Sequence, residues 1–340
     1  MSAEGGPLGV VDAHAHIVPG ELLVGTEALD PSLAELRDVA GRRRLFTKGR
    51  ELTSVVGEFV DPVRMAAEAA AGGIDHLLLS PWVQLLPAGL PPAAARRRSE
   101  LLNAALVAVV SSDPARFSAV GAVPIDYPSE AVAALRAARS AGLAGVELPA
   151  SAANYLGDEA LEPFWAVAEE LEALVFVHPA TRGIALRALD DFYLWNTVGN
   201  PVETAVAGAH LALTGALERH PDLRVLLAHG GGALPGIRGR LRHGHAAVPS
   251  ARGRLSGPIE SSLARFYFDT VTHDVVQLGR LVEDFGAERV LLGSDRPFDM
   301  GDPHPVGAVR RLGLGPAGEG AVLGANAARL LGRARPATSG

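Results

Sequence analysis

Two histidines near the start of the chain have the spacing of a metal-binding pair. His14 and His16 lie in the stretch 10–17, where valine and isoleucine flank an alternating pattern that predicts a strand. Alternate residues of a strand point to the same face, so both imidazoles are expected on one side. Neutral imidazole nitrogens bind zinc at about 2.0–2.1 Å. The pair alone is weak evidence, because a second His-x-His occurs at 243–245.

Three further side chains that could share a metal follow other predicted strands. His178, His229 and Asp295 each stand at the end of an apolar run. Any one of them could have a structural role, but their common position is harder to explain by packing. His178 and Asp295, with the first two histidines, could surround one divalent ion and leave room for a water. The ion would lower the pKa of that water toward about 7, and His229 would remain free to move protons.

The rest of the sequence predicts the elements that bring these side chains together. Eight apolar strands are expected at 10–17, 76–80, 116–124, 145–149, 174–178, 224–229, 266–270 and 289–294, with helices between them. Such runs are typical of parallel strands buried on both faces. Eight β/α units over roughly 300 residues predict a single (β/α)8 TIM barrel, whose active site lies at the C-terminal ends of the strands. We place the barrel at 10–333, between tails at 1–9 and 334–340.

Three extended loops are expected at that end of the barrel. They follow the first, fifth and sixth strands, at 19–60, 179–200 and 230–265, and the first shows little clear periodicity. Connections of this length in a compact domain are usually functional. We expect them to determine the substrate; for the first, a solvated insertion is the alternative.

The composition limits the functional classes. The 340 residues carry a net charge of −7, and 48% of them are hydrophobic. A large core is therefore possible, and no basic excess is present to neutralise the phosphates of a nucleic acid. No apolar run reaches the ~18 residues of a membrane span. The absence of cysteine is compatible with the cytoplasm, and a metal site must be built from histidines and carboxylates.

The motifs around these residues resemble the amidohydrolase superfamily. The resemblance is closest to its amidohydrolase-2 group, the branch of aminocarboxymuconate-semialdehyde decarboxylase, and extends from about residue 9 to 333. It is carried by Asp12-Ala13-His14-Ala15-His16, His178-Pro179, the stretch 195–203, Ala228-His229-Gly230-Gly231-Gly232, Gly293-Ser294-Asp295-Arg296-Pro297-Phe298 and the closing segment 324–331.

The resemblance implies one divalent metal ion and no organic cofactor. The ligands would be His14, His16, His178 and Asp295, and His229 would be the catalytic acid/base. Zn²⁺ is expected, with Mn²⁺ as the alternative, because a set of three histidines and one carboxylate suits several divalent metals.

The resemblance also implies two arginines that bind the substrate carboxylate, a task that suits the bidentate guanidinium. Arg50 is the best match for the first, with Arg44 as the alternative. Arg240, eleven residues past His229, would be the second. In the family it reaches the site of the neighbouring subunit, which predicts a homodimer.

Two more residues are expected at the substrate. Trp195 opens one of the family motifs. Arg296 stands where the family often has an aromatic residue, and could bind a further substrate anion or turn outward into a surface ion pair.

Other polar residues are assigned structural roles. Asp12 is expected to hydrogen-bond backbone or a ligand histidine. Glu147 occupies a region where binuclear relatives carry a modified lysine, so a single metal is expected. His243 and His245 would diverge on a helix. The remaining histidines considered and not expected to be ligands are His76, His210, His220 and His273.

Two reactions remain open for this site. The first is non-oxidative decarboxylation of a small unsaturated or aromatic carboxylate. The second adds water: hydrolysis of a lactone or an amide, or hydration of a double bond. A barrel that only binds a ligand or a partner is disfavoured, because the ligand set is complete.

Overall fold

The computed structural model describes residues 8–19, 35–47, 50–53, 59–152, 155–180 and 183–333. Eight parallel strands form one sheet in the order β1-β5-β6-β7-β8-β9-β10-β11. These are β1 (Val11–Ile17), β5 (His76–Pro81), β6 (Phe117–Ala122), β7 (Gly145–Pro149), β8 (Leu174–His178), β9 (Arg224–Leu227), β10 (Tyr267–Asp269) and β11 (Val290–Leu291). The Ala13 amide donates to the Leu292 carbonyl at 2.8 Å, and the His16 amide to the Arg296 carbonyl at 2.8 Å. These bonds join the first strand to the last, and the predicted (β/α)8 TIM barrel is confirmed.

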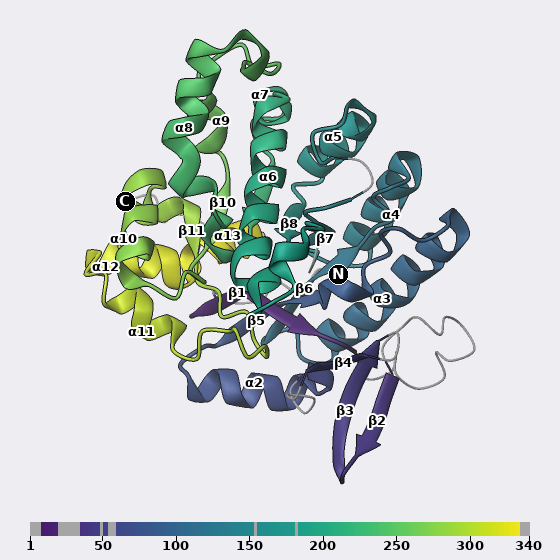
Figure 1. Cartoon of the computed structure of the whole chain (residues 1–340). Helices are drawn as coiled ribbons and strands as arrows, with labels where there is room; N and C mark the ends of the chain where they lie inside the picture. Colours follow the sequence, from purple (N-terminus) through teal and green to yellow (C-terminus); the bar gives the residue numbers. More distant parts are fainter. Residues whose placement is uncertain are drawn as a thin grey trace.

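Helices surround the barrel and connect its strands (Figure 1). They are α2 (Pro62–Ala71), α3 (Pro92–Ser112), α4 (Pro128–Ser140), α5 (Glu162–Glu170), α6 (Asn200–Leu213), α7 (Ala216–Arg219), α8 (Leu234–Ala247), α9 (Ile259–Leu263), α10 (Val275–Phe285), α11 (Pro305–Arg310), α12 (Gly315–Gly320) and α13 (Asn326–Leu330). Proline at the first helical position starts α2, α3 and α4, because its missing N–H has no partner there in any case. None of the helices described is long and apolar enough to cross a membrane.

Each strand buries both of its faces, which explains the continuous apolar runs. On β8, Val175 and Val177 pack toward the helices. Phe176, between them, packs inside the barrel with side chains such as Leu226. Leu330 of α13 belongs to the same inner cluster and closes the barrel at the N-terminal ends of the strands. The polar residues at the C-terminal strand ends thus lie above a packed core.

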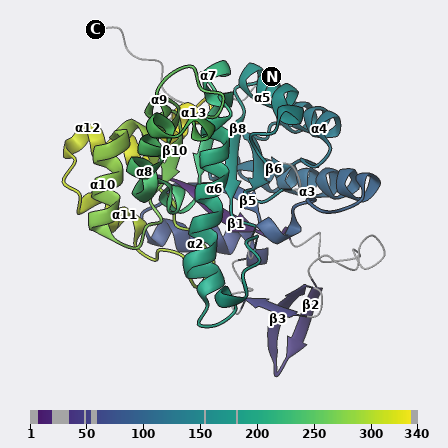
Figure 2. The ribbon, with the colours of Figure 1, turned by 45° about the horizontal axis from the view of Figure 1, so that its top comes forward.

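The first long connection contains regular structure that the sequence analysis did not foresee. β2 (Glu35–Val39), β3 (Arg42–Thr47) and β4 (Arg50–Thr53) form an antiparallel sheet. Figures 1 and 2 show β2 and β3 extending away from the barrel. Ala40 and Gly41 have φ angles of 51° and 75°, as in the two-residue turns that match the twist of a hairpin. In the sequence, Ala40-Gly41 was the feature that could have indicated this hairpin.

The third long connection is largely helical. Between β9 and β10, α8 and α9 occupy much of the segment for which an extended loop was expected. The second connection remains mostly irregular, with short turns at Arg187–Leu189 and Trp195–Gly199 before α6.

Candidate metal centre and active site

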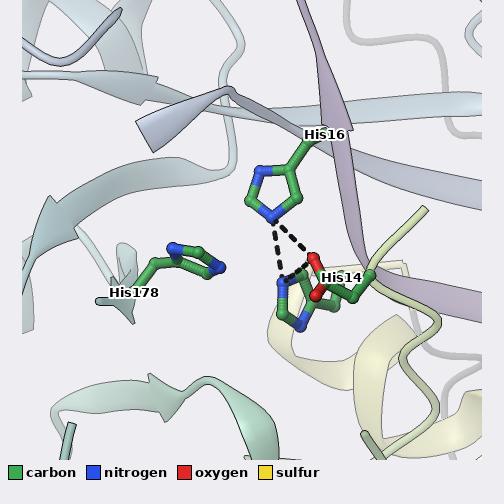
Figure 3. Close-up of side chains that lie close together, drawn as sticks. His14, His16 and His178 are labelled. Atoms are coloured by element: carbon green, nitrogen blue, oxygen red, sulfur yellow. Dashed lines mark hydrogen bonds and ion pairs between the residues drawn. The ribbon is translucent and has the colours of Figure 1, made fainter. Parts of the chain in front are cut away.

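Four buried side chains bring one ligand atom each to a common point. The ligand atoms of His14, His16, His178 and Asp295 all lie within 4.8 Å of one another. The first two come from β1, the third ends β8, and the fourth follows β11. Figure 3 shows the three imidazoles pointing toward one another. The parallel strands place these chain-distant residues together because their C-terminal ends meet on one face of the barrel.

Hydrogen bonds hold the ring of each histidine so that Nε2 faces this point. His14 Nδ1 donates to Asp269 Oδ2 at 2.6 Å, and His178 Nδ1 donates to the Pro179 carbonyl at 3.0 Å. A ring that donates from Nδ1 carries a lone pair on Nε2. This arrangement is typical of metal-binding histidines.

His16 is held in the same tautomer. Its Nδ1 lies 3.0 Å from Ser80 Oγ, which itself donates to the Ala15 carbonyl and is therefore left to accept from His16. Burial lowers the pKa of His16, and it lowers that of His178 well below its usual range. Both rings are therefore neutral at neutral pH, as metal ligands must be.

The converging atoms fit a divalent cation. His14 Nε2 and His16 Nε2 are 3.0 Å apart, and each lies 3.2 Å from Asp295 Oδ1. His178 Nε2 and Asp295 Oδ1 are buried without a hydrogen-bond partner. Burial disfavours a charged His14, but Asp295 and Asp269 outweigh it and raise the pKa of His14 to about 10. Lone pairs packed this closely, in a site that attracts positive charge, suit a bound metal ion.

Asp269 is a central residue that the sequence reasoning missed. It ends β10 and is fully buried. Its Oδ2 accepts from His14 Nδ1 and, at 2.9 Å, from the His229 amide; its Oδ1 accepts from the amides of Gly230 at 2.8 Å and Val271 at 3.0 Å. Burial opposes the charge of Asp269, but the His14 ring outweighs it and lowers the pKa. Its position could have been recognised in the sequence, because Asp269, like Asp295, is a carboxylate at the end of a buried strand.

His229 lies beside the ligand cluster with its ring partly open to the cavity. Its Nε2 is 3.3 Å from Asp295 Oδ2, and its Nδ1 has no hydrogen-bond partner. The residue has φ 57°, and Gly230, Gly231 and Gly232 continue with positive φ. This tight turn aims the imidazole back over the end of the barrel. Glycine is needed at 232, where a Cβ would lie 2.3 Å from the Pro201 carbonyl oxygen.

A cavity of about 1080 Å³ opens above the cluster. Trp195 lines it and packs edge-on against Tyr193, with ring centroids 4.7 Å apart. Trp82 and Phe298 also line it, so aromatic walls surround the approach to His178, His229 and Asp295.

Comparison with known proteins agrees with this geometry. A model of the amidohydrolase family matches residues 11–333. The chain belongs to this family. Among similar proteins, 2-amino-3-carboxymuconate-6-semialdehyde decarboxylase of Dictyostelium discoideum is 27% identical over 309 residues, 87% of this chain and 83% of that protein. The 6-methylsalicylic acid decarboxylase of Penicillium expansum is 29% identical over 60% of this chain and 64% of its own.

Solved structures share the fold of this amidohydrolase. The 5-carboxyvanillate decarboxylase of Sphingomonas paucimobilis has a TM-score of 0.80 at 22% identity, covering 95% of this chain and 99% of that one. The dihydroxybenzoic acid decarboxylase of Polaromonas sp. JS666, with bound manganese, has a TM-score of 0.80 at 20% identity, covering 97% and 98%.

Arg296 of the amidohydrolase packs beneath the site. Its Nε lies 3.4 Å from Asp12 Oδ2 and 3.1 Å from Ser294 Oγ. Asp12 Oδ1 also accepts from the amides of His14 and Ser294, at 3.1 and 3.0 Å. The Arg296 side chain is 14% exposed and does not line the cavity. Arg296 was expected either to bind a substrate anion or to turn outward into a surface ion pair. In the structure it forms an ion pair, but with the buried Asp12 and not at the surface.

Of the other predicted arginines, the structure describes the side chain of Arg240 alone. It is exposed on α8, one turn beyond Gly236, and is not itself among the residues that line the cavity or form the ligand cluster. The backbones of Arg44 and Arg50 belong to β3 and β4, but their side chains lie outside the described part of the structure.

Other polar residues considered in the sequence lie outside the ligand cluster. His76 contacts the Ala115 carbonyl and Ser118 Oγ, both at 2.8 Å. His243 is exposed on α8. Glu147 is fully buried on β7 with neither oxygen hydrogen-bonded, and burial raises its pKa well above the usual range. Burial thus favours its neutral form, and it lies outside the four-residue ligand cluster.

Proposed function

We propose that this amidohydrolase is a metal-dependent carboxy-lyase that removes CO2 from a small unsaturated or aromatic carboxylate without a redox step. The observation that carries the proposal is the convergence of three oriented Nε2 atoms and one carboxylate oxygen beside His229. The similarity to decarboxylases of aromatic and unsaturated acids favours this reaction over others that the same site could support.

His14, His16, His178 and Asp295 would hold the ion. A bound divalent ion supplies Lewis acidity, which polarises a substrate oxygen and stabilises negative charge. We propose Zn²⁺, which suits a buried site of three histidines and one carboxylate. Mn²⁺ is the competitor, because two structures of similar fold contain manganese.

His229 would deliver the proton that the reaction requires. When the bond to the carboxylate breaks, its electron pair remains in the conjugated system until a carbon is protonated. His229 lines the cavity and its side chain is 17% exposed, so its ring can exchange a proton with substrate or solvent. Trp195, Trp82 and Phe298 would hold a planar substrate and exclude water.

We further propose that Arg50 or Arg44 and the partner copy's equivalent of Arg240 bind the substrate carboxylate. Support for a homodimer comes from an apolar groove between α6 and α8, lined by residues such as Val206 and Ile237. These two side chains are 44% and 38% exposed. Arg240 lies one helical turn beyond Ile237 on α8, next to the face that a second copy would cover.

Mass spectrometry of reaction mixtures tests the proposed function. Metal-loaded enzyme is incubated with 2,6-dihydroxybenzoate, with 5-carboxyvanillate and with a metabolite extract, and His229→Ala serves as the control. We expect at least one compound to lose the mass of CO2 with the native enzyme and not with the variant. A compound that instead gains the mass of water would identify a hydrolase or hydratase.

A further inference from the structure

The cavity above the metal centre is larger than one aromatic carboxylate requires. Its volume of about 1080 Å³ exceeds the ~300–1000 Å³ of typical small-molecule sites. Its lining continues from His178 and Asp295 to residues on α8 and α10. A single-ring substrate with its carboxylate at the metal centre occupies only part of this space.

The remote part of the cavity, the α10 arm, lies between α8 and α10. Its lining on α10 consists of Gln277, Arg280, Leu281 and Asp284, whose spacing places them on one helical face. Pro235 and Gly236 line it from the beginning of α8. The two helices are near neighbours in Figures 1 and 2, and an ion pair of 2.7 Å between Arg238 and Asp284 links them.

Among the described residues that line the cavity, Arg280 is the only arginine or lysine. Asp284 lies one turn further along α10, but its carboxylate is bound by Arg238. Arg280 is exposed and forms no ion pair with any part of the chain described. The other carboxylates of the lining, Asp295 and Asp299, belong to the segment after β11 at the metal end. The α10 arm thus presents an uncompensated positive charge to whatever enters it.

Gly236 borders the α10 arm. It lies inside α8, where glycine costs about 1 kcal/mol relative to alanine. A Cβ at this position would meet nothing within 4 Å, and its φ is not in the left-handed region. The space beside Gly236 is therefore free to receive a ligand or a longer side chain.

We propose that the α10 arm is a second substrate subsite, in which Arg280 binds an anionic group that the substrate carries at the end remote from the departing carboxylate. A carboxylate is the simplest such group, because guanidinium binds it bidentately. The substrate class is then an elongated dianion. This inference rests on the proposed carboxy-lyase function only for the identity of the group at the metal centre.

Binding measurements on the metal-loaded enzyme test the subsite without turnover. The probes are benzoate, which has one carboxylate, and 4-(2-carboxyethyl)benzoate, which adds a remote second one. We expect the dianion to bind native enzyme at least tenfold more tightly. Arg280→Gln should remove most of that advantage and change the Kd of benzoate by less than twofold. Arg97→Gln, an exposed arginine on α3, is the control and should change neither.

Two glycine substitutions on α8 distinguish filling of the α10 arm from a general effect on the fold. Gly236→Gln fills the α10 arm, whereas Gly239→Gln meets equally open space and lines no part of the cavity. Both should favour the helix, and only Gly236→Gln should weaken binding of the dianion.

Three results would overturn the subsite. They are equal affinity of native enzyme for the two probes, equal effects of Arg280→Gln on both, and dissociation of a native dimer by Gly236→Gln in sedimentation. The last would assign the α10 arm to a subunit interface. Absence of CO2 release from every compound, with these Kd differences intact, would contradict the proposed reaction and leave the subsite standing.

Discussion

At the scale of single residues, the Asp269 carboxylate joins the two functional parts of the site. One oxygen contacts both the His14 ring and the His229 amide, and the other holds the Gly230 amide. The carboxylate therefore determines which nitrogen of His14 carries the lone pair and supports the strained turn that aims His229. Metal binding and proton transfer should depend on it together.

Asp269→Asn should weaken metal binding about 10- to 100-fold. The amide nitrogen of asparagine can donate to His14 Nδ1, which moves the ring proton to Nε2 and blocks the ligand lone pair. The Kd for Zn²⁺, measured by competition with a chromogenic chelator, checks this. Asp274→Asn is the matched control, because Asp274 caps α10 and asparagine caps helices equally well. An unchanged Kd in Asp269→Asn would assign the carboxylate a purely structural role.

At the scale of elements, buried polar contacts tie together strands that are far apart in the sequence. Asp12 on β1 binds the Ser294 amide and hydroxyl after β11, and Arg296 covers the same carboxylate. Burial raises the pKa of Asp12, although Arg296 opposes that shift. These contacts hold Asp295 against His14 and His16 at the seam where the barrel closes.

Arg296→Met should lower the free energy of unfolding by about 3 kcal/mol, because it leaves a buried carboxyl group without its cation. Urea denaturation measures the change. The double variant Asp12→Asn/Arg296→Met should lose less than the sum of the single changes, since the two groups interact. Strict additivity would show that the pair is not energetically coupled.

Ion pairs between helices make stability depend on pH. Arg219 of α7 binds Glu162 of α5 through two nitrogens, at 2.8 and 2.6 Å. This bond, with a weaker contribution from His220, lowers the pKa of Glu162 to about 2 despite partial burial. A carboxyl with a lowered pKa stabilises the fold above its unfolded pKa of about 4.3, and the contribution is lost as pH falls toward 2.

Glu162→Gln should therefore destabilise the protein near pH 7 by no more than about 1 kcal/mol, because the pair is partly exposed. The difference from the native protein should shrink between about pH 5 and pH 2. Thermal unfolding across this range tests it, with Glu319→Gln on α12 as the control. A difference that grows on acidification would contradict the assigned role.

At the scale of the whole molecule, the candidate metal centre and the proposed subunit interface both depend on the assembled barrel. The four candidate ligands come from β1, β8 and the segment after β11, so a bound ion would link three positions around the sheet. A ligand that binds only the folded state stabilises it by mass action, by about 2.7 kcal/mol at a free concentration 100 times its Kd.

Removal of the metal should lower the Tm, and Zn²⁺ should restore it. Differential scanning calorimetry of chelated and reconstituted enzyme measures the shift. In His178→Ala, which loses one ligand, the same treatment should move the Tm much less. Identical melting of native enzyme with and without metal would exclude an ion at this cluster.

A charged residue in the apolar α6–α8 groove should dissociate the proposed homodimer. Val206→Glu places a carboxylate in the groove, where a second copy would bury it without a partner. Sedimentation velocity should show a monomer for this variant and a dimer for the native chain. Val63→Glu, at a 69% exposed position on α2, should remain dimeric. A native chain that is monomeric at all concentrations would refute the interface.

The sequence alone was enough to predict the barrel and the four residues of the ligand cluster. Strand periodicity is local, and the strand ends at His14, His178 and Asp295 can be read from a few neighbouring residues. Once the strands are parallel, the common position of their ends follows from the topology.

Tertiary structure decided which side chains meet around that cluster. Asp269 and its partner His14 are 255 residues apart, so no local pattern reveals the bond. Arg296 has a long side chain, whose direction depended on the buried Asp12 carboxylate nearby. The α10 arm likewise exists only because α8 and α10 pack side by side. Contacts between distant segments depend on three-dimensional packing, and the spacing of residues along the chain carries little information about them.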